Sequence, residues 1–403
     1  MKHKVLLAAA VAAALALTGC SSGQGGTTSD SPKAETGPIK IGMVIPLTGR
    51  YAALGAGDKT AAEQMVKTIN DKGGVDGRKI ELTVQDDKTD VTQSVTLFNQ
   101  MAADKDVSIV LSSSNVSASV AVGSSAESAK MPILALGPVS AFANGSNKYA
   151  FTVPATPELY AQEMVDYLKS TGLKTLAIGF DGKDVYGTTG NDATKAAAKK
   201  AGIDVVMDEP YDSSATDFTP LITHVKDSHA DGLLIWGSGP APVIITKAVA
   251  AAGGIKLFMT GSEATTLYTQ PAGAAAEGVA IASAAGVAGA AMPAGPFKTM
   301  IDDFADTYKA NNDGVYPPQF AFDGAAGIQL AVAAIKKAGS SDREAIRDAL
   351  ENIDVLTVNG HFRYSPSNHT GLTTDALAVV IVKDGQFTAS DFTKDRFATS
   401  LPK

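Results

Sequence analysis

Cysteine is almost absent from this sequence: its 403 residues include one cysteine and one tryptophan, together with five histidines. One cysteine excludes a disulfide framework within the chain, a thiolate zinc site and a four-cysteine iron–sulfur cluster. No two histidines have the i, i+4 spacing that places both imidazoles on one helical face, so a histidine zinc site has no support either. The sequence predicts no bound metal.

Basic charge is also scarce. Charged residues make up 19% of the chain and the formal net charge is −8, which excludes a dedicated nucleic-acid binder, because such proteins need a basic surface. The phosphate loop G-x-x-x-x-G-K and the nucleophile elbow G-x-S-x-G are both missing. Gly55 and Gly57 open a predicted helix after the first predicted strand, but Thr60 occupies the third glycine position of a dinucleotide fingerprint. We therefore expect no cofactor and no enzymatic activity.

Long hydrophobic runs are absent except near the N-terminus, where Lys2 and Lys4 precede 13 apolar residues at 5–17. At 1.5 Å per residue this run is too short to cross about 30 Å of hydrocarbon, so it is typical of a signal peptide. It ends in Leu-Thr-Gly-Cys at Cys20, which resembles a bacterial lipobox. We predict a lipoprotein signal peptide at 1–20 with lipidation at Cys20, and a flexible Ser/Gly/Thr-rich tether at 21–38. The alternative is an ordinary secretory signal with an incidental cysteine.

From residue 39 onward, short β-branched runs alternate with longer amphipathic stretches, the pattern of parallel sheets covered by helices. This predicts an α/β protein with two doubly wound, Rossmann-like lobes. The Ala/Gly-rich segment 271–296, low in charge, is predicted to be a crossover between the lobes. The expected strands are 40–46, 79–85, 107–111, 133–136, 175–180, 204–207, 232–236, 256–260 and 278–283, with others near His361 and Ala378, and the expected helices are 56–72, 90–105, 116–130, 157–171, 187–201, 217–227, 241–252, 297–311, 319–337 and 342–352.

Several segments, in order along the chain, together resemble one known family. They are 41–49 (IGMVIPLTG), 69–80 (INDKGGVDGRKI), Asp86-Asp87, Tyr186-Gly187, 250–254 (AAAGG), 334–339 (AIKKAG) and 360–364 (GHFRY). The chain resembles, over 39–387, the solute-binding proteins of branched-chain amino acid ABC importers, the leucine/isoleucine/valine-binding group. The resemblance implies a type I periplasmic-binding fold with three crossovers. It also implies a first lobe at 39–154 and 287–370 and a second at 155–286 and 371–403.

The resemblance further implies that hydroxyls and helix N-termini of the first lobe bind the ligand carboxylate, which the unpaired amides and dipole of a helix start favour. The polar run 112–117 ends a predicted strand and opens a helix, and the next such loop is 137–141. The candidates here are Ser113, Asn115, Ser117, Val139, Ser140 and Ala141. The alternative is that these serines only cap a helix.

In the second lobe, Tyr186 matches the family's cleft tyrosine and Glu263 the acid that pairs with the ligand ammonium. A carboxylate in a closed cleft is costly unless a cation pairs with it, so Glu263 predicts a ligand that carries an amine. The alternative is a glutamate in an exposed loop. Gly239 is a further candidate contact. The chain departs from the family pattern after the predicted strand 232–236, where the family commonly has another aromatic residue and this sequence reads Trp-Gly-Ser-Gly-Pro at 236–240. Trp236 either ends a buried strand or lines the pocket.

These expectations combine into a membrane-anchored, extracytoplasmic lipoprotein that binds an amino acid, branched-chain or related, and delivers it to an ABC permease. It is expected to be a monomer that binds no nucleic acid. Arg50 and Tyr51 either line the mouth of the cleft or form a solvated turn. The rival ligands are amides, urea and aromatic or dicarboxylic acids. The rival role is the sensing module of a receptor.

Overall fold

The computed structural model describes residues 36–401. The predicted signal peptide, the lipidation site Cys20 and most of the predicted tether lie outside the described residues. Within that part of the chain, no helix is both long and apolar enough to cross a membrane.

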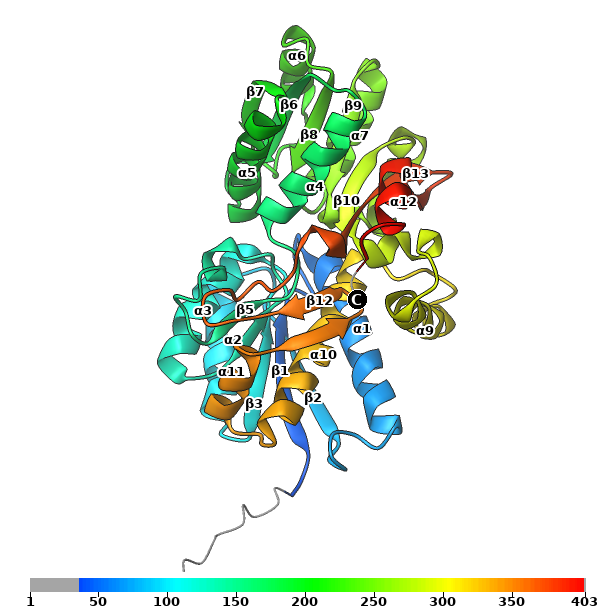
Figure 1. Cartoon of the computed structure of the whole chain (residues 1–403). Helices are drawn as coiled ribbons and strands as arrows, with labels where there is room; N and C mark the ends of the chain where they lie inside the picture. Colours follow the sequence, from blue (N-terminus) through cyan, green and yellow to red (C-terminus); the bar gives the residue numbers. More distant parts are fainter. Residues whose placement is uncertain (1–35, 402–403) are drawn as a thin grey trace, which may run out of the picture. The chain divides into compact units, whose positions relative to one another are not determined.

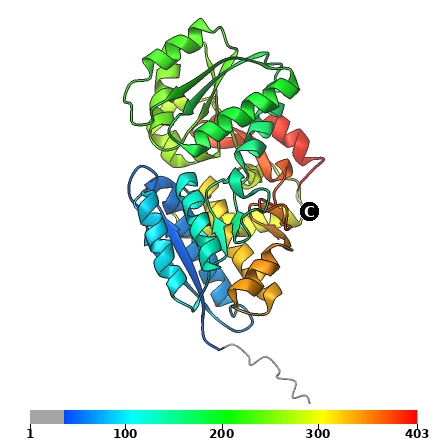
Figure 2. The same ribbon diagram turned by 90° about the vertical axis from the view of Figure 1, so that its left-hand side faces the viewer.

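The first lobe is built on a parallel five-stranded sheet in the order β2-β1-β3-β4-β5. β1 and β3 lie in its interior and are almost entirely buried, which explains their nearly continuous apolar sequences. Helices cover both faces (Figure 1, Figure 2). The strands are β1 (Ile39–Ile45), β2 (Ile80–Asp86), β3 (Val107–Ser112), β4 (Ile133–Ala135) and β5 (Ala150–Thr152), and the helices are α1 (Ala52–Asp71), α2 (Val91–Ala103), α3 (Val116–Ala129), α10 (Gln319–Ala338) and α11 (Arg343–Leu350).

The second lobe is built on a seven-stranded sheet in the order β14-β13-β10-β9-β8-β6-β7. Its five strands from β6 to β10 run parallel, whereas β13 and β14 pair antiparallel at one side. The strands are β6 (Thr175–Asp181), β7 (Asp204–Tyr211), β8 (Gly232–Trp236), β9 (Lys256–Thr260), β10 (Ala280–Ala284), β13 (Leu377–Lys383) and β14 (Gln386–Ala389), and the helices are α4 (Pro157–Ser170), α5 (Val185–Ala201), α6 (Thr219–Asp227), α7 (Ala241–Ala252), α8 (Thr266–Ala272) and α12 (Asp391–Phe397).

The chain passes between the two sheets three times: from β5 to α4, from β10 to α10, and from β12 (Gly360–Arg363) to β13. The second passage includes η4 (Ala285–Ala291) and α9 (Pro296–Asn311), and β11 (Asp354–Thr357) pairs with β12 before the third. The predicted class, two doubly wound α/β lobes joined by three crossovers, is confirmed. The exact lobe boundaries stay a prediction.

The start of the first helix was predicted wrongly, because α1 begins at Ala52 and contains both Gly55 and Gly57. These glycines are packing residues. A Cβ at Gly55 would lie 2.0 Å from the carbonyl oxygen of Pro46, and one at Gly57 would lie 3.1 Å from Cβ of Phe320. Gly55 therefore lets α1 approach the backbone at the end of β1, and Gly57 allows a close contact with α10.

Segment 271–296 contains the predicted strand 278–283, which is β10 in the interior of the seven-stranded sheet. All five residues of β10 are buried, so the low charge of this segment reflects burial. The sequence pattern predicted no strand at β5, β11 or β14 and no helix at α8 or α12, and it ended the strand β7 before its last residues, which reach Tyr211.

Candidate functional site

One cavity lies where the carboxyl ends of strands from both lobes meet, the place at which open α/β sheets bind ligands. The loops after β1, β3 and β4 of the first lobe and after β6, β8 and β9 of the second all contribute to it. We call it the inner compartment; the space there measures about 440 Å³ with open solvent included, of which about 30 Å³ is free to the centre of a water molecule. Its lining residues are Tyr51, Leu54, Ser114, Asn115, Val116, Leu136, Pro138, Pro154, Tyr160, Asp184, Tyr186, Ser238, Gly261, Ser262, Gln319, Phe320 and Asp323.

The loop between β3 and α3 supplies the polar wall of the first lobe. Asn115 is the N-cap of α3, and its Oδ1 accepts the amides of Ser117 at 2.9 Å and Ala118 at 3.4 Å. Ser113 is turned into the core, where its Oγ accepts the amide of Asn115. Asn115 therefore lines the cavity together with Ser114 and Val116, while Ser113 and Ser117 hold the loop in shape.

The loop after β4 reaches the cavity through Leu136 and Pro138. The three residues predicted from this loop lie outside the lining. Val139 is buried, and its carbonyl accepts a hydrogen bond of 3.0 Å from Oγ1 of Thr152. Ser140 begins the short helix η1, and its Oγ donates to Glu158 at 2.8 Å, while Ala141 is exposed.

Tyr186 forms part of the wall of the second lobe. Its hydroxyl shares a hydrogen bond of 2.6 Å with Oγ1 of Thr260, and its ring meets the ring of Trp236 edge to face. Trp236 is 0% exposed, donates from Nε1 to Thr194, and packs so closely on α5 that a Cβ at Gly190 would lie 2.1 Å from its ring. Of the two roles left open by the sequence, Trp236 therefore ends a buried strand and supports Tyr186 from behind.

Glu263 and Gly239 line a second hollow, which we call the outer compartment. Glu263 is only 2% exposed, and its Oε2 has no hydrogen-bond partner within residues 36–401. Burial raises the pKa of this carboxyl well above its usual range. Gly239 has φ of +81°, and a Cβ there would lie 3.1 Å from the carbonyl oxygen of Arg50, so this loop of the second lobe touches the first.

Two residues of the β1–α1 loop bridge the lobes. Tyr51 Oη donates to Oδ2 of Asp184, and Arg50 Nη1 donates to Oγ of Ser213 at 2.7 Å and lies 3.8 Å from Asp181 Oδ2. Arg50 also covers the ring of Tyr51, with its guanidinium carbon 4.5 Å from the ring centroid. The sequence left open a solvated turn here, whereas the structure brings Tyr51 into the cavity wall.

Sequence reasoning missed a pair of buried acids on the first-lobe side. Asp323 accepts Nε2 of Gln319 at 3.0 Å and Nδ2 of Asn359 at 2.7 Å. Burial, opposed by these two donors, raises the pKa of Asp323 to about 7. Asp58 accepts Oγ of Ser114 at 2.6 Å, and burial together with the nearby charge of Asp323 raises its pKa well above the usual range.

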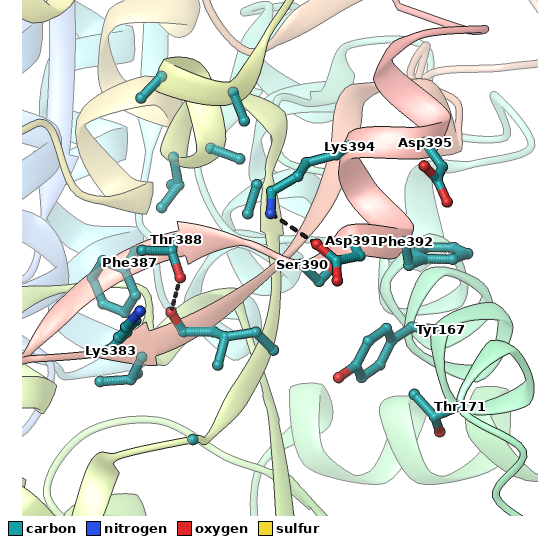
Figure 3. A pocket seen from close by; sticks show the side chains of 18 of the residues that line it. Tyr167, Thr171, Lys383, Phe387, Thr388, Ser390, Asp391, Phe392, Lys394 and Asp395 are labelled. Carbon is teal, nitrogen blue, oxygen red and sulfur yellow. Dashed lines mark hydrogen bonds and ion pairs between the residues drawn. The ribbon is translucent and has the colours of Figure 1, made fainter.

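A larger hollow lies away from this cleft, on the second lobe around β13, β14 and α12 (Figure 3). It is an open surface groove, in which Lys394 pairs with Asp391 at 2.8 Å. It brings together no buried, unpartnered polar group from two lobes. The interlobe cavity is therefore the candidate site.

A sequence profile of the family described as periplasmic binding protein matches residues 38–386. The chain belongs to the periplasmic binding protein family. Leu/Ile/Val-binding protein homolog 3 of Brucella melitensis is 30% identical over 315 residues, which cover 76% of this chain and 81% of that relative. The predicted kinship with the leucine/isoleucine/valine-binding group is confirmed.

Solved structures of periplasmic binding proteins share the fold. An extracellular ligand-binding receptor from Rhodopseudomonas palustris HaA2 is 26% identical, with a TM-score of 0.80 over 88% of this chain and 99% of that one. The branched-chain amino acid transporter substrate-binding protein LivJ from Streptococcus pneumoniae, in complex with isoleucine, is 19% identical, with a TM-score of 0.76 over 87% of this chain and 98% of that one.

The candidate residues of this periplasmic binding protein thus fall into three groups. Asn115 and Tyr186 line the inner compartment, and Gly239 and Glu263 line the outer one. The remaining candidates lie outside both linings: Ser113, Ser117, Val139, Ser140, Ala141 and Trp236. Across residues 36–401 no group of three or more His, Cys, Asp or Glu side chains is arranged to hold a metal ion.

Proposed function

We propose that this periplasmic binding protein is the lipid-anchored substrate-binding component of an ABC importer. It binds an amino acid between its lobes and delivers it to a permease, without catalysis. In this proposal Cys20 carries the lipid, and the acidic body works on the outer side of the cell membrane. The named relatives, homologues of Leu/Ile/Val-binding proteins, support an amino acid as the ligand.

The observation that carries the proposal is the carboxyl group of Glu263. It is buried at the cleft with one oxygen unpartnered within the described chain, and an unpaired buried charge is unfavourable by several kcal/mol. A ligand ammonium beside Oε2 removes this penalty. Bound ligand is therefore expected to lower the pKa of Glu263 and to leave the carboxylate ionised.

The carboxylate of the ligand meets the start of α3. The first four amides of a helix have no acceptor within the helix, and the cap Asn115 takes those of Ser117 and Ala118. This leaves the amide of Val116, a cavity-lining residue at the first helical position, as a donor for the ligand carboxylate. The positive end of the helix dipole favours an anion at the same place.

The test is calorimetry on the full chain in detergent with leucine and with its des-amino analogue, 4-methylpentanoate. The wild type should prefer leucine strongly. Because a hydrogen bond to a charged group contributes about 1.5–3 kcal/mol, Glu263→Gln should weaken leucine binding by about ten- to a hundredfold and erase most of the preference. The matched control is Glu277→Gln, the same change at an exposed glutamate. Equal discrimination by the wild type and Glu263→Gln would refute the ammonium site.

A further inference from the structure

A buried carboxylate of α10, Asp323, is the centre of a hydrogen-bond network beside the inner compartment. Its Oδ2 accepts a hydrogen bond of 3.0 Å from Nε2 of Gln319, and its Oδ1 accepts one of 2.7 Å from Nδ2 of Asn359. All three side chains are at most 2% exposed. Asp323 and Gln319 line the inner compartment, whereas Asn359 lies outside the linings of both compartments.

Gln319 extends this network to the second lobe. Its Oε1 accepts a hydrogen bond of 2.6 Å from the amide of Ala284, the last residue of β10, where the second crossover begins. Its own backbone amide donates to the carbonyl of Ala264 at 3.0 Å, and Ala264 directly follows Glu263. One residue at the start of α10 therefore binds the end of a second-lobe strand and the loop that carries Glu263.

Asn359 extends the network to the other crossovers. Its Nδ2, which donates to Asp323, also donates to the carbonyl of Val153 at 3.4 Å, and Val153 follows β5 at the start of the first crossover. Asn359 itself lies in the turn between β11 and β12, and β12 leads into the third crossover. Asp323 thus stands between segments that must adjust whenever the lobes move relative to each other.

Stability alone does not explain such a network. Replacing buried charged groups by apolar groups of similar size is often neutral or stabilising. A polar network with its partners in place instead specifies one arrangement, because a shift of any member leaves a buried group unpaired. The arrangement specified here is that of the crossovers, since the two partners of Asp323 are bonded to Ala284 and Val153.

We propose that Asp323 is a positioning residue for ligand binding, which acts through Gln319 and Asn359 to fix the crossovers in the lobe orientation that binds the ligand. This role needs no contact between Asp323 and the ligand. The inference rests on the proposed function in one respect, that the ligand binds between the lobes. A change at Asn359, outside the cavity, should then alter ligand affinity, since only molecules in the competent orientation bind.

The first measurement is amide hydrogen exchange of the ligand-free full chain in detergent. Asn359→Ala should speed exchange in residues 280–291, which include Ala284 and are far from Asn359 in sequence, by about threefold or more. A merely local defect would speed exchange only around the β11–β12 turn. The matched control is Asn191→Ala: Asn191 is also buried and its Nδ2 donates to a carboxylate, that of Asp208 at 3.3 Å, but this pair lies within the second lobe.

The second measurement is calorimetry with leucine on the same samples, together with their melting temperatures. Asn359→Ala should weaken leucine binding by about three- to thirtyfold, whereas Asn191→Ala should leave it within about twofold. In an Asp323→Leu background, Asn359→Ala should change the affinity by less than about twofold, because the carboxylate through which it acts is gone.

The outcomes separate the two proposals. Unchanged exchange of residues 280–291 in Asn359→Ala, or an equal effect of Asn191→Ala, would overturn this inference. Faster exchange with unchanged leucine affinity would overturn it too, as would an undiminished effect of Asn359→Ala without Asp323. If the wild type binds no amino acid, the proposed function fails, and the exchange measurement alone decides whether Asp323 fixes the crossovers.

Discussion

The phenol of Tyr51 donates a hydrogen bond of 2.5 Å to Oδ2 of Asp184, across the cleft between the lobes. Both side chains are buried. Asp184 is the N-cap of α5, and its Oδ1 accepts the amide of Tyr186 at 3.2 Å. One carboxylate therefore holds the start of the helix that carries Tyr186 and also joins that helix to the first lobe.

Tyr51→Phe should loosen the contact between the lobes. A hydrogen bond to a charged group contributes about 1.5–3 kcal/mol, and here it forms only where the lobes meet, so ligand affinity should fall by about ten- to a hundredfold, mainly through faster dissociation. Stopped-flow measurement of ligand release checks this. Tyr364→Phe is the control, because it removes a buried hydrogen bond, to the carbonyl of Thr152, away from the cleft. An unchanged release rate in Tyr51→Phe would contradict the bridging role.

The buried acid Asp323 should make stability depend on pH. Its pKa is raised from 3.8 to about 7, so between these values the folded protein holds a proton that the unfolded chain releases. The free energy of unfolding should therefore fall as pH rises from about 4 to about 7, and this contribution should level off above that.

Urea unfolding of the ligand-free protein at several pH values from 5 to 8 measures this slope. Asp323→Asn should make the slope smaller by at most about 1.4 kcal/mol per pH unit. Some slope should remain, because the pKa values of Asp58, Glu163 and Glu263 are raised as well. The amide introduced by Asp323→Asn would also face two donors, so the stability itself should drop at every pH. An identical slope in both proteins would show that Asp323 does not titrate in this range.

Arg396 should be critical for stability, because it is the ion-pair partner of the buried Glu163. Its Nη2 also donates to the carbonyl of Thr374 at 2.8 Å, so it ties α12 to α4 and to η5 (Thr374–Ala376). Removing one partner leaves a buried charge uncompensated, and Arg396→Leu should destabilise the fold by about 3–5 kcal/mol.

The matched control is Lys394→Leu, which breaks the exposed pair with Asp391 and should change stability by less than about 1 kcal/mol. Adding Glu163→Leu to Arg396→Leu should recover part of the loss, because the unpaired acid is then gone. Denaturant unfolding measures all of these variants, and a similar effect from Arg396→Leu and Lys394→Leu would rule out a structural ion pair.

Cys20→Ser should release the protein from the membrane. In the proposed anchor, one diacylglycerol on Cys20 supplies two acyl chains. A single acyl chain binds a membrane only weakly, whereas two chains give stable attachment. The folded body should be unaffected, so ligand binding should be unchanged. Cell fractionation decides the point: a variant that stays in the membrane pellet as the wild type does would leave an ordinary signal sequence as the better interpretation.

The alternation of apolar runs was enough to predict two α/β lobes, because buried parallel strands and amphipathic helices leave strong local patterns. Packing between distant segments was not predictable. Gly55 and Gly57 were interpreted as a helix start, although α1 begins earlier, at Ala52, and the two glycines are there to accommodate the close contacts with Pro46 and Phe320. That contact is invisible in a local sequence pattern.

The site was predictable to the level of loops rather than side chains. Glu263 carried a signal because a family resemblance pointed to it. Asp58 and Asp323 carried none, since each acid is unremarkable alone and their proximity arises only when α1 packs on α10. Ser113 precedes the cavity residue Ser114 and Trp236 lies two residues before Ser238, yet both Ser113 and Trp236 are buried in the core, which their place in the sequence does not reveal.

Gly261 should control the capacity of the inner compartment. It follows β9 and lines the cavity, and a Cβ there would lie 3.0 Å from Oε1 of Gln319 and 3.1 Å from the hydroxyl of Tyr160. Its φ is not in the left-handed region, so alanine fits the backbone and the added methyl group only takes up space.

Overpacking of this kind typically costs about 1–3 kcal/mol, and in Gly261→Ala much of that cost should fall on the ligand-bound state. Affinity should fall by about five- to a hundredfold while the melting temperature stays within a few degrees of wild type. Gly295→Ala is the control, because a Cβ there meets nothing within 4 Å. Calorimetry and thermal unfolding on the same samples separate the two effects, and full affinity in Gly261→Ala would place the ligand outside the inner compartment.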